Sequence, residues 1–375
     1  MKHEYSIGWS QDQHFLHRRF KISRLRMALE YGFPDDDTTG ELAMLFYGGD
    51  FFDHLADSVH DEDFQDSCAY ISWRLQSAAR WNYPIRILKG TRSHDMDQVA
   101  WWVKLNDALE KPADLRYVDT VSIESHPILG DILYIPDNWK PTADEVWEDV
   151  CELLRSKNME MVDWIIMHGA FKHQLPEHIH NKVTFLHDSK RYSSICRKYV
   201  LVGHVHISSQ WKNIISCGSL DRAAFGEEAP KGMMKITCRE KGDDILFIEN
   251  PHARTMLTYP VKDNNPDIED VVSWIEDQIK KYDEDYMSLR FMVSKTSEVF
   301  LNQKALVSKF PKVELVFADS DEKSKAKNHL IKLEQNKTLI TEYDLSDNSV
   351  MGMLRKRIGD NYTQGIEEKI KGIFS

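Results

Sequence analysis

The sequence has few cysteines, no long apolar segment and no excess of positive charge. Its five cysteines are scattered and never form a C-x-x-C pair, which argues against a disulfide framework and a thiolate metal site. No apolar run reaches the roughly 18 residues of a membrane-spanning helix, and Met1–Ser6 lacks the apolar stretch of a secretory signal. These absences predict a protein of a reducing cytoplasm with no membrane partner.

The charge balance excludes one way of binding nucleic acid. Lysine and arginine number 48 against 60 aspartates and glutamates, a net charge of −12, so bulk electrostatic attraction alone cannot hold DNA. A nuclease is still compatible, because carboxylates that hold divalent metals add negative charge where the substrate phosphate binds. Histidine is abundant, with 16 residues, and several lie beside Asp or Gly, a context typical of metal ligands.

Hydrophobic patterning predicts an α/β fold. The chain has 375 residues, 42% of them hydrophobic, enough for two domains and an appendage. Strand-length apolar runs alternate with amphipathic segments, which favours a layered α/β architecture. The runs cover residues 42–47, 85–88, 128–135, 164–167, 199–202, 214–217 and 233–237. Helices are expected at residues 55–80, 98–109 and 143–156.

The C-terminal third has a different organisation. Strands at 288–293 and 313–318 and helices at 268–282 and 299–310 predict a small α/β unit. A charged linker follows, and the tail carries an apolar stripe at helical spacing, interrupted by Gly359 and Gly365. We therefore divide the chain into residues 1–245, 246–320, 321–345 (linker) and 346–375 (helical tail).

Five short segments that follow predicted strands carry potential metal ligands. They are Asp12-Gln13-His14, Gly48–Asp53 with Asp50, Gly90–Asp95, His168-Gly169 and Gly203–His206. Aspartate and histidine suit Mn, Fe or Zn. Alternate residues of a strand share a face, so Asp12 and His14 are expected to point at one metal, and His204 and His206 likewise. Asp50, after two glycines that allow close backbone approach, is placed to bridge two metals. Two such ions clamp a phosphate and generate hydroxide, which predicts phosphoester hydrolysis.

The ordered set resembles a known pattern. Calcineurin-like metallophosphoesterases carry the motifs D-x-H, G-D-x-x-D, G-N-H-D, H-G and G-H-x-H in this order, and the chain is similar to four of the five over about residues 5–210. Gly218–Glu228, followed by Lys231-Gly232, resembles the P-G-S-L-x-R-x-x-F-G-E…K-G stretch of SbcD-type DNA repair nucleases. That group includes the meiotic-recombination-eleven nuclease and the bacteriophage recombination-endonuclease subunit. The resemblance implies a two-sheet α/β sandwich flanked by helices, with a small α/β capping domain that binds DNA at residues 246–320.

The resemblance also implies roles for individual residues. It assigns one metal to Asp12, His14, Asp50 and His206, and the other to Asp50, His168 and His204. His94, with Asp95 beside it, would be the catalytic histidine that steadies the phosphate or protonates the leaving oxygen.

Three positions depart from the family pattern. The Asn of G-N-H-D is absent: Ser93 stands in its aligned place as a metal ligand, with Thr91 or a water as alternatives. Arg92, new in this loop, would contact a substrate phosphate, or it is a solvated arginine. Asp53 stands where these nucleases often carry His. It is a residue that supports a metal ligand, a catalytic residue or a helix N-cap.

The implied function is metal-dependent 3′-to-5′ exonuclease and single-strand endonuclease activity on DNA. The metals would be two divalent ions, Mn with Mg or Fe as alternatives. The implied partners are a second copy, paired through the helices at 55–80 and 98–109, and an SbcC-type coiled-coil ATPase held by the tail. The setting is a cytoplasm, that of the host if the protein is viral. Two alternatives remain: a phosphatase acting on a small phosphoester, and a non-catalytic adaptor that positions the ATPase on DNA.

Overall fold

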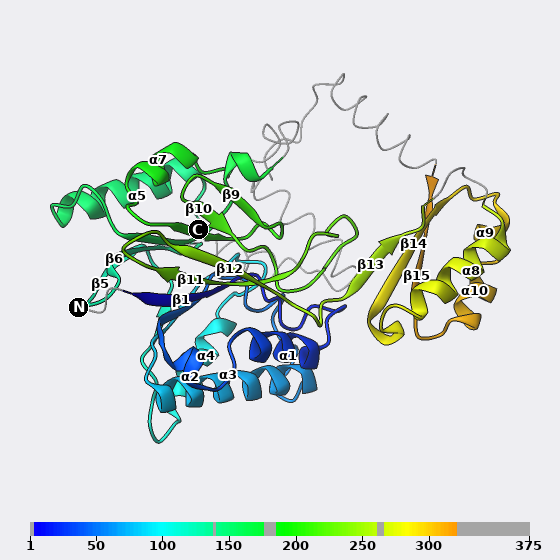
Figure 1. Ribbon diagram of the computed structural model, residues 1–375, viewed down its shortest axis with the longest axis horizontal. Coiled ribbons are helices and arrows are strands. Elements are labelled where there is room, and N and C mark those ends of the chain that lie inside the picture. Colours follow the sequence, from blue (N-terminus) through cyan, green and yellow to red (C-terminus); the bar gives the residue numbers. More distant parts are fainter. Residues whose placement is uncertain (1–3, 138–139, 176–184, 261–265, 321–375) are drawn as a thin grey trace, which may run out of the picture.

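The part of the chain that the structure describes contains three β-sheets, and the first has six strands. The computed structural model describes residues 4–137, 140–175, 185–260 and 266–320 (Figure 1). The order in the first sheet is β12 (Asp244–Glu249), β11 (Gly232–Cys238), β1 (Tyr5–Ser10), β2 (Leu42–Tyr47), β3 (Ile85–Leu88) and β4 (Leu115–Val118). Strands β1 to β4 are parallel to one another, whereas β11 pairs antiparallel with both of its neighbours, β1 and β12.

The second sheet is also six-stranded and mixed. Its order is β5 (Ser122–His126), β6 (Gly130–Ile135), β7 (Trp164–His168), β8 (Val200–Gly203), β10 (Ile214–Ser216) and β9 (Ser209–Trp211). The four central strands are parallel, and the two edge strands are antiparallel. Every residue of β7 and β8 is buried, as expected for parallel strands covered on both faces.

The two sheets pack face to face between layers of helices (Figure 1). Trp9 and Phe46 of the first sheet and Tyr134, Trp164 and Ile166 of the second share one apolar core. The outer face of the first sheet is covered by α1 (Ile22–Gly32), α3 (Glu62–Trp81) and α4 (Trp101–Asp107), with the short α2 (Asp37–Gly40) beside α3. The outer face of the second is covered by α5 (Ala143–Ser156) and α7 (Ser189–Ser194). This four-layer arrangement agrees with the α/β sandwich expected from the sequence.

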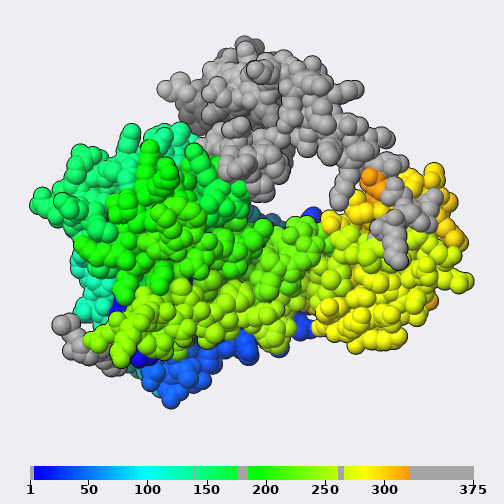
Figure 2. Space-filling model, turned by 45° about the horizontal axis from the view of Figure 1, so that its top comes forward, coloured from blue at the N-terminus to red at the C-terminus, as the bar shows by residue number. Residues whose placement is uncertain are grey.

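The third sheet belongs to a small unit at one end of the molecule (Figures 1 and 2). Its three parallel strands are β13 (Thr255–Thr258), β14 (Met287–Val293) and β15 (Glu314–Asp319). The helices α8 (Ile268–Ile279), α9 (Glu298–Leu301) and α10 (Gln303–Lys309) pack on it around Leu289 and Phe291. The division expected at 245/246 falls inside β12, so the first sheet continues to Glu249.

Two further expectations can be compared with the structure. The helix predicted to begin at residue 55 begins only at Glu62, because Asp61 caps it by accepting a hydrogen bond from the Phe64 amide, 3.0 Å away. Leu55 and Val59, counted in its apolar face, are exposed, so that part of the prediction is wrong. None of the described helices is long and apolar enough to cross a membrane. The predicted linker (321–345) and tail (346–375) lie outside the described residues.

A buried polar joint connects the small unit to the sandwich. The carboxylate of Asp221 accepts hydrogen bonds from the Tyr286 hydroxyl at 2.7 Å and from the Arg254 amide at 2.6 Å. The Arg254 guanidinium donates to Ser288 at 2.8 Å and to Glu314 at 2.9 Å. Because these groups are largely buried, the joint has to remain fully hydrogen-bonded to be stable.

Removing one donor should therefore destabilise the fold. We expect Tyr286→Phe to lower the free energy of unfolding by about 1–3 kcal/mol, because it takes a hydrogen bond from a buried carboxylate. Urea denaturation measures this, with Tyr282→Phe as the control, since Tyr282 is 43% exposed. Equal midpoints for the two variants would show that the joint contributes nothing.

Candidate metal centre

The potential ligands gather in loops at the carboxyl ends of parallel strands. Asp12 follows β1, Asp50 follows β2, and His204 follows β8, while His168 is the last residue of β7. Carboxyl ends of parallel strands meet at one edge, where ligands bind in open α/β sheets. Among the described residues, one group of potential ligands, His14–Asp53–His94, shares His14 with another group. The other two groups are Asp12–His14–His206 and Asp50–His168–His204, and the ligand atoms of each lie within 4.8 Å of one another. We call these groups the first and the second site.

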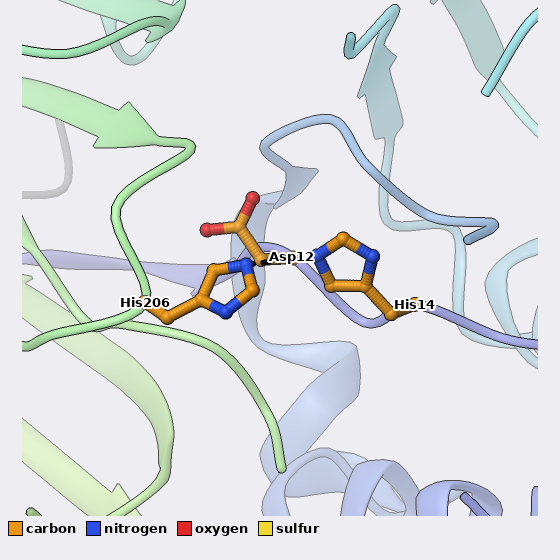
Figure 3. Close-up of side chains that lie close together, drawn as sticks. All are labelled: Asp12, His14 and His206. Atoms are coloured by element: carbon orange, nitrogen blue, oxygen red, sulfur yellow. Dashed lines mark hydrogen bonds between the residues drawn. The ribbon is translucent and has the colours of Figure 1, made fainter. Parts of the chain in front are cut away.

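The geometry of the first site suits one cation (Figure 3). The Nε2 atoms of His14 and His206 are 2.9 Å apart. Two nitrogens about 2.1 Å from one ion are separated by about 3 Å when they subtend a right angle, so this spacing fits shared coordination. Asp12 is fully buried, and its carboxylate accepts hydrogen bonds from the Gln11 side chain and the His204 amide, both at 2.9 Å. Its position is therefore fixed by the protein.

The loop conformation that makes the first site differs from the expected strand alternation. Asp12 and His14 lie beyond β1, each with φ of 49°, so they converge through left-handed backbone and the alternation argument is wrong. The Asp12 amide donates to the Gly49 carbonyl, and the His14 amide to the Asp50 carbonyl, both at 3.1 Å. Likewise, His204 and His206 contribute to different sites and do not share one.

The second site is built on a buried carboxylate–imidazole pair. His168 Nε2 lies 3.3 Å from Asp50 Oδ2, and both side chains are at most 2% exposed. His168 Nδ1 donates to the Gly48 carbonyl at 2.7 Å, which directs Nε2 toward Asp50. Burial alone would raise the pKa of Asp50, but His168, followed by His14 and His94, holds that pKa well below its usual value. Burial would lower the pKa of His168, but the charge of Asp50 raises it. A cation would therefore replace the proton that this pair holds.

Two glycines make this close approach possible. A Cβ at Gly49, which has φ of +90°, would lie 2.4 Å from His168 Nδ1. A Cβ at Gly90 would lie 2.2 Å from Asp50 Oδ1. Any larger residue at either position would push the strand ends apart.

The structure places Thr91, and not Ser93, beside the second site. Thr91 Oγ1 is 2.7 Å from both carboxylate oxygens of Asp50 and 3.4 Å from His168 Nε2. Ser93 is exposed. The reason is a tight turn, in which the His94 amide donates to the Thr91 carbonyl at 3.0 Å. Thr91, at the start of this turn, therefore lies against Asp50. Thr91 is thus the neutral oxygen available at the place expected for the missing Asn.

Two alanine variants separate these candidates. We expect Thr91→Ala to weaken binding of one Mn²⁺ about tenfold, because a hydroxyl that contacts the ligand carboxylate is lost. Ser93→Ala should leave both affinities unchanged. Free Mn²⁺ measured by electron paramagnetic resonance gives the two affinities of each variant. Weaker binding in Ser93→Ala than in Thr91→Ala would instead make Ser93 the ligand.

The other predicted residues lie around the two sites. His94 Nδ1 donates to the Asp53 carbonyl at 2.7 Å, and its ring meets that of His14 edge-on at 4.8 Å. Asp95 is fully buried and accepts from the amides of Phe52 at 2.9 Å and Gly90 at 2.8 Å. Burial, followed by the charge of Asp50, raises the pKa of Asp95 to about 8. Asp95 therefore holds two site loops together and is not presented to a substrate.

Asp53 faces the histidines and caps no helix, since Asp61 caps α3. Asp53 Oδ1 lies 3.2 Å from His14 Nδ1 and 3.8 Å from His94 Nδ1. Burial would raise the pKa of Asp53, but the contact with His14 lowers it to about 2. The N-cap alternative is therefore wrong.

Arg92 is exposed at the edge of a cavity of about 620 Å³, which we call the Arg92 cavity. Its other described lining residues are Thr91, Ser93, Met96, Asp137, Lys140 and Phe185. Because Thr91 belongs to this lining and also contacts Asp50, the cavity opens beside the second site. Cationic, acidic and apolar side chains together line this cavity.

Sequence reasoning assigned no role to Gln11, Glu227 or Lys231. Gln11 binds Asp12, as described above, and Glu227 Oε1 lies 3.3 Å from His206 Nδ1. Lys231 Nζ donates to Glu227 at 2.8 Å. A signal was present for the last two, because both occur in the segment that resembles F-G-E…K-G, but spacing alone did not indicate contact with a ligand.

Comparison with known proteins does not show a family. No family model matches the chain, and no curated protein matches it. Among solved structures 43 chains match, and one of these aligns with 66% of this chain and 99% of its own, at 10% identity and a TM-score of 0.37. A similarity at that level carries no argument about fold or function. The functional case therefore rests on the geometry of the two sites and on the motifs.

Proposed function

We propose that this chain is a metal-dependent DNA nuclease of the calcineurin-like, SbcD type. The observation that carries the proposal is the pair of adjacent Asp/His sites at the carboxyl ends of the parallel strands. Aspartates and histidines without a thiolate suit Mn²⁺, with Mg²⁺ or Fe as alternatives. When bound, such a pair of ions polarises a phosphodiester and supplies a hydroxide nucleophile near neutral pH.

Individual residues of the chain have distinct roles in the proposed reaction. Asp12, His14 and His206 would hold one ion, and Asp50, His168 and His204 the other, with Asp50 as the bridging carboxylate. His94, anchored through Nδ1 on the Asp53 carbonyl, would present its other nitrogen to the phosphate or to the leaving oxygen. Asp95 keeps the loops of Asp50 and Thr91 in register.

The Arg92 cavity supports a nucleotide substrate. Arg92 supplies positive charge for a phosphate, whereas Met96 and Phe185 supply apolar contact for a base. Lys140 in the same lining is paired with Asp149 at 3.1 Å. In a chain of net charge −12, a cationic side chain beside the site favours a polyanionic substrate.

Three further parts of the proposal rest on the resemblance. These are 3′-to-5′ polarity, a homodimer, and an SbcC-type ATPase bound by residues 346–375. Exposed Leu55 and Val59, before α3, are consistent with an interface at the predicted dimer helices. The tail lies outside the described residues, so its role stays a prediction.

A nuclease assay tests the proposal. End-labelled single- and double-stranded DNA is incubated with Mn²⁺, Mg²⁺ or chelator, with and without the ATPase, and with the Asp50→Asn variant as the control for contaminating nuclease. We expect cleavage with Mn²⁺ that chelator and the substitution both abolish. Hydrolysis of a small phosphomonoester without DNA cleavage would favour the phosphatase, and absence of bound metal would favour the adaptor.

A further inference from the structure

Each histidine of the first site has a carboxylate next to its Nδ1 atom. On one side, Glu227 Oε1 lies 3.3 Å from His206 Nδ1. The other oxygen of Glu227 accepts from Lys231 Nζ at 2.8 Å and from the Ala223 amide at 3.4 Å. Lys231 Nζ also donates to the backbone carbonyl of His206 at 2.8 Å. These contacts run from the His206 imidazole through Glu227 and Lys231 to the His206 carbonyl. They therefore fix both the side chain and the backbone of His206.

A second carboxylate approaches His14 from a different loop. Asp53 Oδ1 is 3.2 Å from His14 Nδ1, an ion-pair distance without the alignment of a hydrogen bond. Asp53 follows β2, whereas Glu227 lies between β10 and β11. The two supports are therefore structurally independent, and each leaves the Nε2 atom of its histidine directed into the first site.

The second site lacks this arrangement at His168, whose Nδ1 donates to a neutral backbone carbonyl, that of Gly48. A carboxylate behind a ligating imidazole fixes its tautomer and raises its basicity, and loss of such a partner typically costs about 10–100-fold in metal affinity. The effect is large where solvent is excluded. The side chain of Glu227 is 16% exposed, that of Lys231 1% and that of His206 26%, so solvent is largely excluded from this contact.

We propose that Glu227 is a positioning residue for the ligand His206 and that, together with Asp53, it makes the first site the higher-affinity of the two metal sites. This inference rests on the metal-dependent chemistry proposed above. Loading is then sequential: the first site fills at low metal concentration, and the second fills only as the concentration rises. Occupancy of the second site would set how much of the protein is active.

Mn²⁺ titration followed by electron paramagnetic resonance tests the order of affinities. The full chain should bind two ions in separate phases, the tighter by at least about tenfold. His168→Asn removes a ligand of the second site, so this background should retain only the tight phase. Adding Glu227→Gln there should weaken the remaining ion by about 10–100-fold. The matched control is Glu228→Gln, which makes the same charge change at an exposed neighbour and should have no effect.

A second variant and a melting temperature distinguish weaker metal binding from loss of the fold. Glu227→Gln removes the charged partner of buried Lys231, so its apo melting temperature is measured alongside. Asp53→Asn, whose side chain is 22% exposed, should weaken the same phase from the opposite side of the site. Two equal phases in the wild type, or equal affinities for the Glu227→Gln and Glu228→Gln proteins, would overturn the inference while leaving the proposed function intact. A wild-type chain that binds no Mn²⁺ would instead refute the proposed function itself.

Discussion

Replacing Asp50 with asparagine should abolish DNA hydrolysis while the protein still folds. Asp50 accepts from the Thr91 amide at 2.6 Å and the Thr91 hydroxyl at 2.7 Å, and its other oxygen faces His168 at 3.3 Å. An amide keeps the shape and the acceptor oxygen but removes the charge from the proposed bridge. Loss of a bridging ligand should cost several kcal/mol, at 1.36 kcal/mol per tenfold in rate. We therefore expect less than about a tenth of the activity to remain.

The control for this prediction is a neighbouring aspartate. Asp57 is exposed on the same loop, so Asp57→Asn makes an identical charge change away from the site and should leave the rate unchanged. Mn²⁺ binding and circular dichroism are measured on both variants. An Asp50→Asn protein that keeps more than a tenth of the wild-type rate would remove the bridging role.

Apolar runs predicted the central strands well, and their failures have local causes. The runs at 42–47 and 85–88 coincide with β2 and β3, because strands buried on both faces carry continuous apolar sequence. Strand β1 was not recognised among the apolar runs, since Ser6, Gly8 and Ser10 interrupt it, yet it lies in the middle of the first sheet. Gly8 is required there: a Cβ would come within 2.6 Å of Leu45.

The sequence predicted which residues make up the site better than it predicted which of them contact one another. Motif order placed four of the five ligand segments directly after predicted strands, because function concentrates where parallel strands terminate. The fifth segment, Asp12–His14, follows β1, which the apolar runs did not include. Which residues share a site depends on left-handed backbone at Asp12 and His14, which spacing does not encode. That Thr91 lies beside the second site, where Ser93 was expected, likewise depends on the turn between Thr91 and His94. Glu227, 21 residues beyond His206, is brought to its ligand by the course of the chain between β10 and β11.

Substitution of His94 by alanine should slow hydrolysis by roughly 10²–10⁴-fold with metal occupancy unchanged. Its Nδ1 is engaged by the Asp53 carbonyl, and its side chain is 32% exposed, so the other nitrogen can reach a bound phosphate. His94 also lies close enough to His14 and Asp53 to form a potential ligand group. Mn²⁺ stoichiometry must therefore be measured with the rate, and loss of an ion from His94→Ala would make His94 a ligand.

The choice of substrate separates the two remaining roles of His94. A histidine that protonates the leaving oxygen matters little when the leaving group is already a good one, because that group departs without a proton. The rate loss in His94→Ala should then be far smaller on the p-nitrophenyl ester of a nucleotide than on DNA. If the imidazole instead steadies the charged phosphate, both substrates should lose the same factor, since that charge develops with either leaving group. His60→Ala, at an exposed histidine after Val59, is the control for removal of an imidazole elsewhere and should slow neither reaction.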